Sequence, residues 1–419
     1  MLRSEMVKNS FTLISGTVIA QIIPVALQPL LRRIFTPEDF GVFAIYMSLL
    51  GMLAAFSSLK YETTLVLPKR DKDANNLLVG SILVVFGFSI LFLILIFFLK
   101  SFIIDYFNFP PSISKWMFLL PLSAFIFASY QVMNYWLIRK KRFKASAINK
   151  VLRRSTEGTA QTGFGFSMVS SGLIIGNLLG DIVNFFSGIY QIRKNSFTLK
   201  VVSFRRIFYL LSRYKEFPIY SGLPSFLNTV SLLIPVLIIT RFFDEEIAGF
   251  YSLSQMVLAL PLALVSVSVS QVLLQQISEK IKTSNSIRST VSILALVLTS
   301  LSIPFLLIVL LFGEVLFDLF FGIEWRQSSD ITQLLIYAYA LKFIVSPLSV
   351  VFIALEKVKV SGIWQLTYFI AICSLFLLKF NNVREFFIVY LIIELVMYTI
   401  YLLMIHRQIR LYEMQLIKD

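Results

Sequence analysis

The sequence has little of what metalloproteins and soluble enzymes are built from. Its 419 residues include one cysteine, Cys373, and one histidine, His406. A single cysteine excludes a disulfide within the chain, and a single histidine excludes motifs that need two. Only 15% of the residues are charged, against about 25% in an average soluble protein. No glycine-rich phosphate-binding loop is present, so any energy source would be a gradient or the consumption of the substrate.

What the chain has instead is long apolar segments. Hydrophobic residues make up 57% of it, and the mean hydropathy is +0.81. A helix that crosses a bilayer needs about 20 mostly apolar residues, and such segments recur from end to end. We expect an all-α integral membrane protein with twelve transmembrane helices, at about 10–33, 41–59, 76–99, 115–138, 145–166, 170–191, 217–240, 248–276, 288–312, 328–354, 361–379 and 383–405.

The fifth of these segments is not apolar. It contains "KVLRRSTEGTAQ", from Lys150 to Gln161, and hydropathy alone does not identify it. The positive-inside rule decides the question, because a crossing here leaves most of the 38 lysine and arginine residues in connections on one side. The sequence therefore predicts that the segment crosses and that both termini are cytoplasmic. The net charge of +15 follows this loop pattern, which argues against nucleic acid as a partner.

The charged residues of this segment share one helical face. Lys150, Arg153, Arg154, Glu157 and Gln161 are spaced i, i+3, i+4, i+7 and i+11. An arginine or lysine at the bilayer centre costs about 2.5–3.5 kcal/mol, so such a face turns to the bundle interior or a wet cavity. In the simpler alternative, Lys150 and Arg153 reach the cytoplasmic headgroups while Arg154 and Glu157 form a local ion pair.

Other expected helices also have polar residues spaced along one face, which we call polar stripes. One stripe alone is explained by hydrogen bonds between helices. Several stripes together, with prolines among them, indicate a water-filled central path. The polar residues expected to line it are Gln21, Gln28, Gln161, Asn177, Asn184 and Asn228.

An internal repeat relates the two halves of the chain. "RIFTPEDFGVF" (33–43) and "RFFDEEIAGFY" (241–251) align without a gap, each between the first and second helix of a six-helix half. The identical positions pair Arg33 with Arg241, Phe35 with Phe243, Glu38 with Glu246 and Gly41 with Gly249. Because both copies are expected on the same outer side of the membrane, the two halves should be parallel repeats related by an axis along the membrane normal. We expect an N-terminal lobe at 1–196, a cytoplasmic linker at 197–216 and a C-terminal lobe at 217–419.

Several sequence blocks resemble one family over nearly the whole chain. They are "FTPEDFGVFAIYMSLLGML", "LKYETTLVLPK", "YKEFPIYSGLPSFLN", "AGFYSLSQMVLALPLALVSVSVSQV", "FGIEWR" and "SPLSVVFIALEK". They resemble bacterial polysaccharide transporters, the O-antigen and lipid-linked oligosaccharide flippases of the multidrug/oligosaccharidyl-lipid/polysaccharide exporter superfamily. The resemblance implies an inner-membrane protein that moves an undecaprenyl-pyrophosphate-linked repeat unit from the cytoplasmic to the periplasmic leaflet by alternating access.

An anionic glycan headgroup needs positive charge along its path. The candidates for contact with it are Arg153, Arg154, Lys150, Arg32, Arg33, Arg241 and Lys342. Arg32, Arg33 and Arg241 are equally explained as interfacial anchors. Glu157 and Asp181 are candidates for coupling to protons or ions, with a static salt bridge as the alternative for each. The expected partners are the lipid-linked glycan and membrane lipid, and no cofactor or metal is expected. Partnership with a glycan polymerase and a chain-length regulator stays open.

Three other functions fit less well. A multidrug or cation efflux antiporter would share the twelve helices, but its path should favour carboxylates over arginines. A glycan polymerase or ligase would need a large outer loop, and the outer connections here are short. A glycosyltransferase would rest on "DKD" at 71–73, a pattern that charged loops produce often and that no nucleotide-binding domain accompanies.

Overall fold

The computed structural model describes residues 20–416, apart from the side chains of residues 263, 264, 267 and 268. Part of the first expected helix, 10–33, therefore lies outside the described residues. The chain forms two compact units, Met1–Gly249 and Phe250–Asp419. Throughout residues 20–416 the secondary structure is helical, with no strand.

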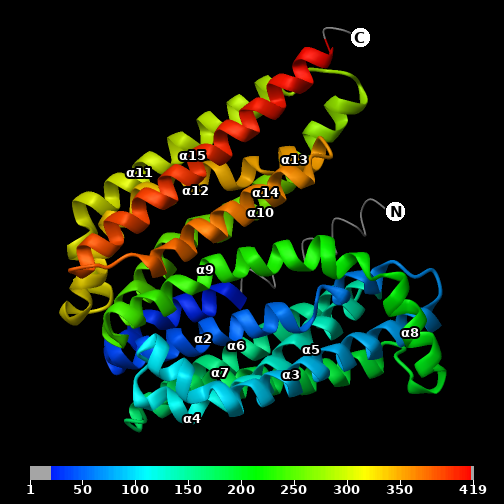
Figure 1. Ribbon diagram of the computed structural model, residues 1–419, viewed down its shortest axis with the longest axis horizontal. Helices are drawn as coiled ribbons and strands as arrows, with labels where there is room; N and C mark the ends of the chain where they lie inside the picture. The colour runs from blue at the N-terminus through cyan, green and yellow to red at the C-terminus, as the bar shows by residue number, and fades with distance from the viewer. Residues whose placement is uncertain (1–19, 417–419) are drawn as a thin grey trace. The chain divides into compact units, whose positions relative to one another are not determined.

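From residue 20 onward, the first unit contains seven long helices and several short turns of helix, and these long helices run alongside one another (Figure 1). In chain order they are residues 20–34, α2 (Pro37–Ser57), η1 (Tyr61–Val66), α3 (Asp71–Phe107), η2 (Pro111–Ile113), α4 (Ser114–Met117), α5 (Leu120–Arg139), α6 (Phe143–Phe166), α7 (Gly172–Lys194), η3 (Leu199–Val201), α8 (Phe204–Arg213), the π-helical turn η4 (Pro218–Gly222) and α9 (Leu223–Phe242).

The second unit begins within a long helix, because the boundary between the units falls after the first turns of α10 (Glu245–Lys282). The elements that follow are α11 (Arg288–Phe320), η5 (Ile323–Trp325), α12 (Arg326–Leu348), α13 (Val350–Ala354), α14 (Val358–Cys373), η6 (Ser374–Leu377) and α15 (Val383–Leu416).

Twelve long helices in the described part match the twelve predicted segments in order. Among these residues, eight helical stretches are long and apolar enough to cross a membrane, and the bent pair Pro111–Met117 and Leu120–Arg139 makes a ninth. The charged helix α6 is not among them, as its composition leads one to expect. It nevertheless has 24 residues, and at 1.5 Å per residue it is about 36 Å long. That length exceeds the roughly 30 Å hydrocarbon core of a bilayer.

The predicted linker, 197–216, contains the short helix α8, which packs on α3. Arg206 binds Asp73 of α3 through two nitrogen–oxygen contacts of 2.8 and 3.0 Å. Ile207 and Leu210 are buried, whereas Phe204 and Phe208 are exposed. The helix after it, α9, packs against α2 within the first unit. The predicted division into lobes at 1–196 and 217–419 stays a prediction.

The repeated segment starts a helix in both halves. In the first copy Thr36 caps α2, with its hydroxyl accepting from the Asp39 amide and its own amide donating to the Asp39 carboxylate. This capping box satisfies two amides that a helix start leaves unpaired. In the second copy the Asp244 carboxylate accepts from the Ile247 amide at 2.9 Å and so caps α10. The aligned residues Thr36 and Asp244 therefore cap the helix that follows each copy.

The glycines of the repeat allow the two copies to touch. A Cβ built on Gly41 would overlap the carbonyl oxygen of Glu245, and one built on Gly249 would overlap the carbonyl oxygen of Pro37. The first turns of α2 and α10 thus pack backbone to backbone. Only glycine, which lacks a Cβ, permits this approach.

Candidate functional site

The charged helix α6 lies directly against α7, as Figure 1 shows. Gly172, Gly176 and Gly180 form a stripe of small residues on α7, each one turn from the next. A Cβ on Gly176 would lie 2.5 Å from Cγ of Gln161, and one on Gly180 would lie 3.0 Å from Cβ of Glu157. Small residues at this spacing let membrane helices approach closely. The stripe brings the polar face of α7 against that of α6.

A buried ion pair links these two helices. Nε of Arg153 lies 2.5 Å from Oδ1 of Asp181, and the two side chains are only 12% and 1% exposed. The Arg153 guanidinium also lies 5.5 Å from the ring centroid of Phe127 on α5. Burying two charges is costly, and such a pair is stable only while both partners are present. Arg153 and Asp181 therefore hold α5, α6 and α7 together, whatever else they do.

Arg154 and Glu157 form a second ion pair, one turn apart on α6. The nitrogen–oxygen distance is 2.8 Å, and Arg154 remains 33% exposed while Glu157 is 9% exposed. The amide of Asn177 on α7 donates to the other oxygen of Glu157 at 3.3 Å. Glu157 is thus fixed by both helices, whereas the Arg154 guanidinium keeps access to its surroundings.

The interface between α6 and α7 contains buried polar atoms without hydrogen-bond partners. Gln161 donates to the carbonyl oxygen of Leu173 at 3.0 Å. Within the described residues, buried oxygens of Asp181, Asn177 and Asn184 have no hydrogen-bond partner. Buried polar atoms are nearly always satisfied, so this interior is suited to a proton or a small polar group.

The predicted candidates on the first helix have different environments. Arg32 is 3% exposed, and its guanidinium lies 3.5 Å above the ring centroid of Phe40, with Nε donating to Gln28 at 3.1 Å. Gln21 and Arg33 are exposed. Arg32 is therefore part of the packed interior of this unit, and Arg33 is at its surface.

The candidates on α9 lie apart from the α6–α7 cluster along the sequence. Arg241 donates to the carbonyl oxygen of Tyr106 at 3.2 Å, and its guanidinium lies 3.8 Å from the Tyr106 ring centroid. Asn228 is half-buried. Contact with an aromatic ring at a helix end is typical of an interfacial anchor, the alternative that the sequence left open for Arg241.

The second unit contains a charged pair of its own. Nζ of Lys342 on α12 lies 2.8 Å from Oε1 of Glu394 on α15, and the side chains are 5% and 1% exposed. The Tyr368 hydroxyl donates to the same oxygen at 2.8 Å. Nζ of Lys342 also lies 4.7 Å from the Tyr339 ring centroid and 5.2 Å from that of Tyr398. Lys342 is thus held by a carboxylate and aromatic faces.

Glu394 was not among the residues predicted from the sequence. The signal was present, since "FIVYLIIELVMYTIY" contains this one acidic residue in an otherwise apolar run. An ionisable residue inside a membrane helix is a functional candidate by default. Among the described residues, no group of three or more histidine, cysteine, aspartate or glutamate side chains is arranged to hold a metal ion.

Residues 30–330 match the family described as "Polysaccharide biosynthesis protein". The chain belongs to this family. No curated protein matches it. The matched residues include α6, α7 and both copies of the repeat.

Solved structures with the same fold are found among transporters. One is a multidrug resistance MATE family transporter of the MOP superfamily in an inward-facing conformation, with a TM-score of 0.77 and 14% identity over 94% of this chain and 98% of that one. Another is the lipid II flippase MurJ, with a TM-score of 0.72 and 16% identity over 98% and 91%. A third is a MOP superfamily transporter from Pyrococcus furiosus, with a TM-score of 0.63 and 15% identity over 97% and 96%. The predicted fold class is confirmed.

Proposed function

We propose that this member of the polysaccharide biosynthesis family is a flippase for an undecaprenyl-pyrophosphate-linked oligosaccharide repeat unit. It would act by alternating access in the bacterial inner membrane, with gradient coupling and both termini cytoplasmic. The observation that carries the proposal is α6, a helix of membrane-spanning length with three basic residues on one helical face, of which Arg153 is buried against α7 and Lys150 and Arg154 are half-buried. Such a helix suits an anionic headgroup, and the family name and the fold shared with a lipid II flippase support the same class.

The geometry suggests a different role for each charged residue. Arg153 and Asp181 fix α6 against α7, and Glu157 holds Arg154 in place while leaving its guanidinium one-third exposed. Arg154 is therefore the residue we expect to meet the pyrophosphate, because guanidinium groups bind phosphate oxygens in pairs. The polyprenyl tail would remain in lipid throughout. Glu157, Asp181 and Glu394 are the candidates for proton or ion coupling.

A multidrug or cation efflux antiporter is the alternative, because a MATE transporter shares the fold. Deleting the gene separates the two. A flippase predicts that a lipid-linked glycan accumulates on the cytoplasmic face and that surface glycan is lost. An antiporter predicts drug sensitivity with normal surface glycan, and that result would overturn the proposal.

The first prediction concerns Arg154. We expect Arg154→Ala to reduce glycan export about tenfold or more, the effect of losing a hydrogen bond to a charged group, at nearly normal abundance. Arg154→Lys should restore part of the activity, because it keeps the charge without the guanidinium fork. Complementation of the deletion strain, scored by surface glycan and membrane protein level, measures both effects.

Arg142→Ala is the matched control, since Arg142 is an exposed arginine just before α6. It should export normally. Arg153→Ala is a poorer test, because it leaves Asp181 buried without its partner and lowers abundance. Glu157→Gln separates two roles: export should persist if Glu157 only orients Arg154, and fail if it carries protons. Full complementation by Arg154→Ala at normal abundance would remove Arg154 from the transport path.

A second prediction concerns topology. Reporter fusions after residues 168 and 196 flank α7 and should report outside and inside, respectively. The opposite pattern would mean that α6 does not cross the membrane. It would also place most basic loops outside, against the positive-inside rule.

A further inference from the structure

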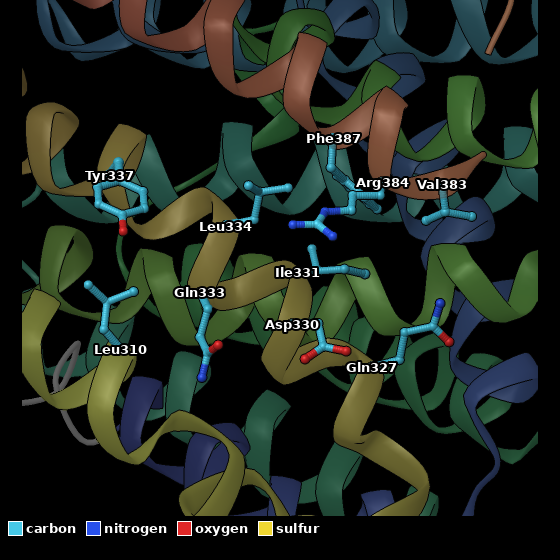
Figure 2. A pocket seen from close by; sticks show the side chains of 10 residues that line it. All are labelled: Leu310, Gln327, Asp330, Ile331, Gln333, Leu334, Tyr337, Val383, Arg384 and Phe387. Atoms are coloured by element: carbon cyan, nitrogen blue, oxygen red, sulfur yellow. The ribbon is translucent and has the colours of Figure 1, made fainter. Parts of the chain in front are cut away.

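A pocket of about 650 Å³ lies in the second unit between α11, α12 and α15 (Figure 2). Its volume is within the range of small-molecule sites. Most of its polar lining comes from the first turns of α12 and from the start of α15. In the proposed topology this is the periplasmic end of the unit, where α11 ends.

The polar lining offers donors and acceptors together. Gln327 and Gln333 have amides that do both, Asp330 accepts, and Arg384 donates. Figure 2 shows the Arg384 guanidinium extending from α15 toward α12. The side chains of Gln327, Asp330 and Arg384 are exposed. Their bonding groups are therefore available to a ligand.

The apolar lining is aromatic in part. Phe387 lines the pocket but is only 1% exposed, whereas Tyr337 is 45% exposed. A lipid chain would leave two amides and two charges unsatisfied, which is costly. A simple anion would be attracted by Arg384 but repelled by Asp330. A polyhydroxylated ring suits the whole set, because its hydroxyls both donate and accept while a C–H face can pack on the exposed ring of Tyr337.

We propose that this pocket binds saccharide, as an exit-side site for the glycan of the transported unit. The inference rests on the proposed function for the origin of the glycan, but the site itself is defined by its own side chains. Binding here would hold the headgroup at the outer face after translocation and oppose its return.

Binding to the purified full-length protein in lipid nanodiscs tests the proposal. The probes are fluorescently labelled soluble oligosaccharides derived from bacterial surface polysaccharides, presented as an array. We expect at least one to bind. Gln327→Ala, Asp330→Asn and Arg384→Ala should each weaken that binding about fivefold to tenfold, the loss of one hydrogen bond. All three residues are exposed, so the variants should retain the wild-type elution profile.

Glu324→Gln is the matched control, because Glu324 is exposed in η5 near the same end but does not line the pocket. It should bind as the wild type does. Absence of binding to the array, or binding that none of the three pocket variants weakens, would overturn the inference. If the deletion strain retains glycan on the cytoplasmic face while no oligosaccharide binds, the pocket fails and the flippase stands. If saccharide binds while the deletion strain exports normally, the flippase proposal fails and the pocket stands as a saccharide site.

Discussion

Gly249→Leu is expected to remove nearly all folded protein from the membrane, and Gly41→Leu should do the same. At both positions the new Cβ would overlap a backbone carbonyl oxygen, which cannot turn aside as a side-chain atom can. Overpacking of a tight interior typically costs about 1–3 kcal/mol, and backbone contacts place these two sites at the upper end. Immunoblots of membrane fractions and size-exclusion profiles of the solubilised protein measure the loss.

Two other glycines provide controls for the same substitution. Gly87 lies within α3 and Gly362 within α14, and a Cβ at either position would meet nothing within 4 Å. Gly87→Leu and Gly362→Leu should therefore insert and elute like the wild type. Normal abundance of Gly41→Leu and Gly249→Leu would show that the first turns of α2 and α10 separate without penalty.

The second large effect concerns the buried pair in the C-terminal unit. Glu394→Ala would leave the Lys342 ammonium buried without its carboxylate, and breaking such a pair typically costs about 3–5 kcal/mol. We expect the folded protein to fall several-fold in the membrane. Lys342→Met should have a similar effect, because it leaves Glu394 charged and buried. Thermal unfolding of the solubilised protein, followed by intrinsic fluorescence, compares the variants.

The double variant Lys342→Met/Glu394→Gln is the decisive companion. It removes both charges and keeps an amide oxygen to accept from Tyr368, so stability should return to nearly the wild-type level. Its export activity then reports on function alone: full export means that the pair is structural, and failed export at normal abundance means that the charges are needed in transport. Single variants as stable as the wild type would show that the buried charge is satisfied without its partner.

Most of the fold was predictable because membrane helices are constrained by length and hydropathy. The positions of α2, α3 and α15 follow apolar runs. The expected start of the second helix, residue 41, was too late, because Thr36, Pro37 and Asp39 form a capping pattern that starts α2 at Pro37. The helix α6 was predictable only through the charges of the other loops, because its own composition is that of a solvated helix. The lengths of α3 and α15 exceed the apolar runs, since hydropathy marks where lipid ends and not where a helix ends.

The site was less predictable, because helical periodicity places residues on one face of a helix but does not show which residues that face contacts. The i, i+3, i+4, i+7 spacing identified the face of Arg153 and Glu157. It did not show that Asp181 would neutralise Arg153, since partner choice depends on the rotation and register of α7. The glycine stripe at Gly172, Gly176 and Gly180 contained that information. Glu394 was missed for another reason: a lone acidic residue forms no stripe.

The contact between Gly249 and Pro37 also constrains how the chain is made. About 210 residues separate the two, so at 5–20 residues per second a ribosome reaches Gly249 about 10–40 s after Pro37. By the end of that interval α2 to α9 have been synthesised, but the surface of α2 around Gly41 still lacks its contact with the first turn of α10. A chain arrested before residue 245 would present that surface to the insertion machinery. The N-terminal unit can therefore finish assembling only once the next helix has begun to emerge.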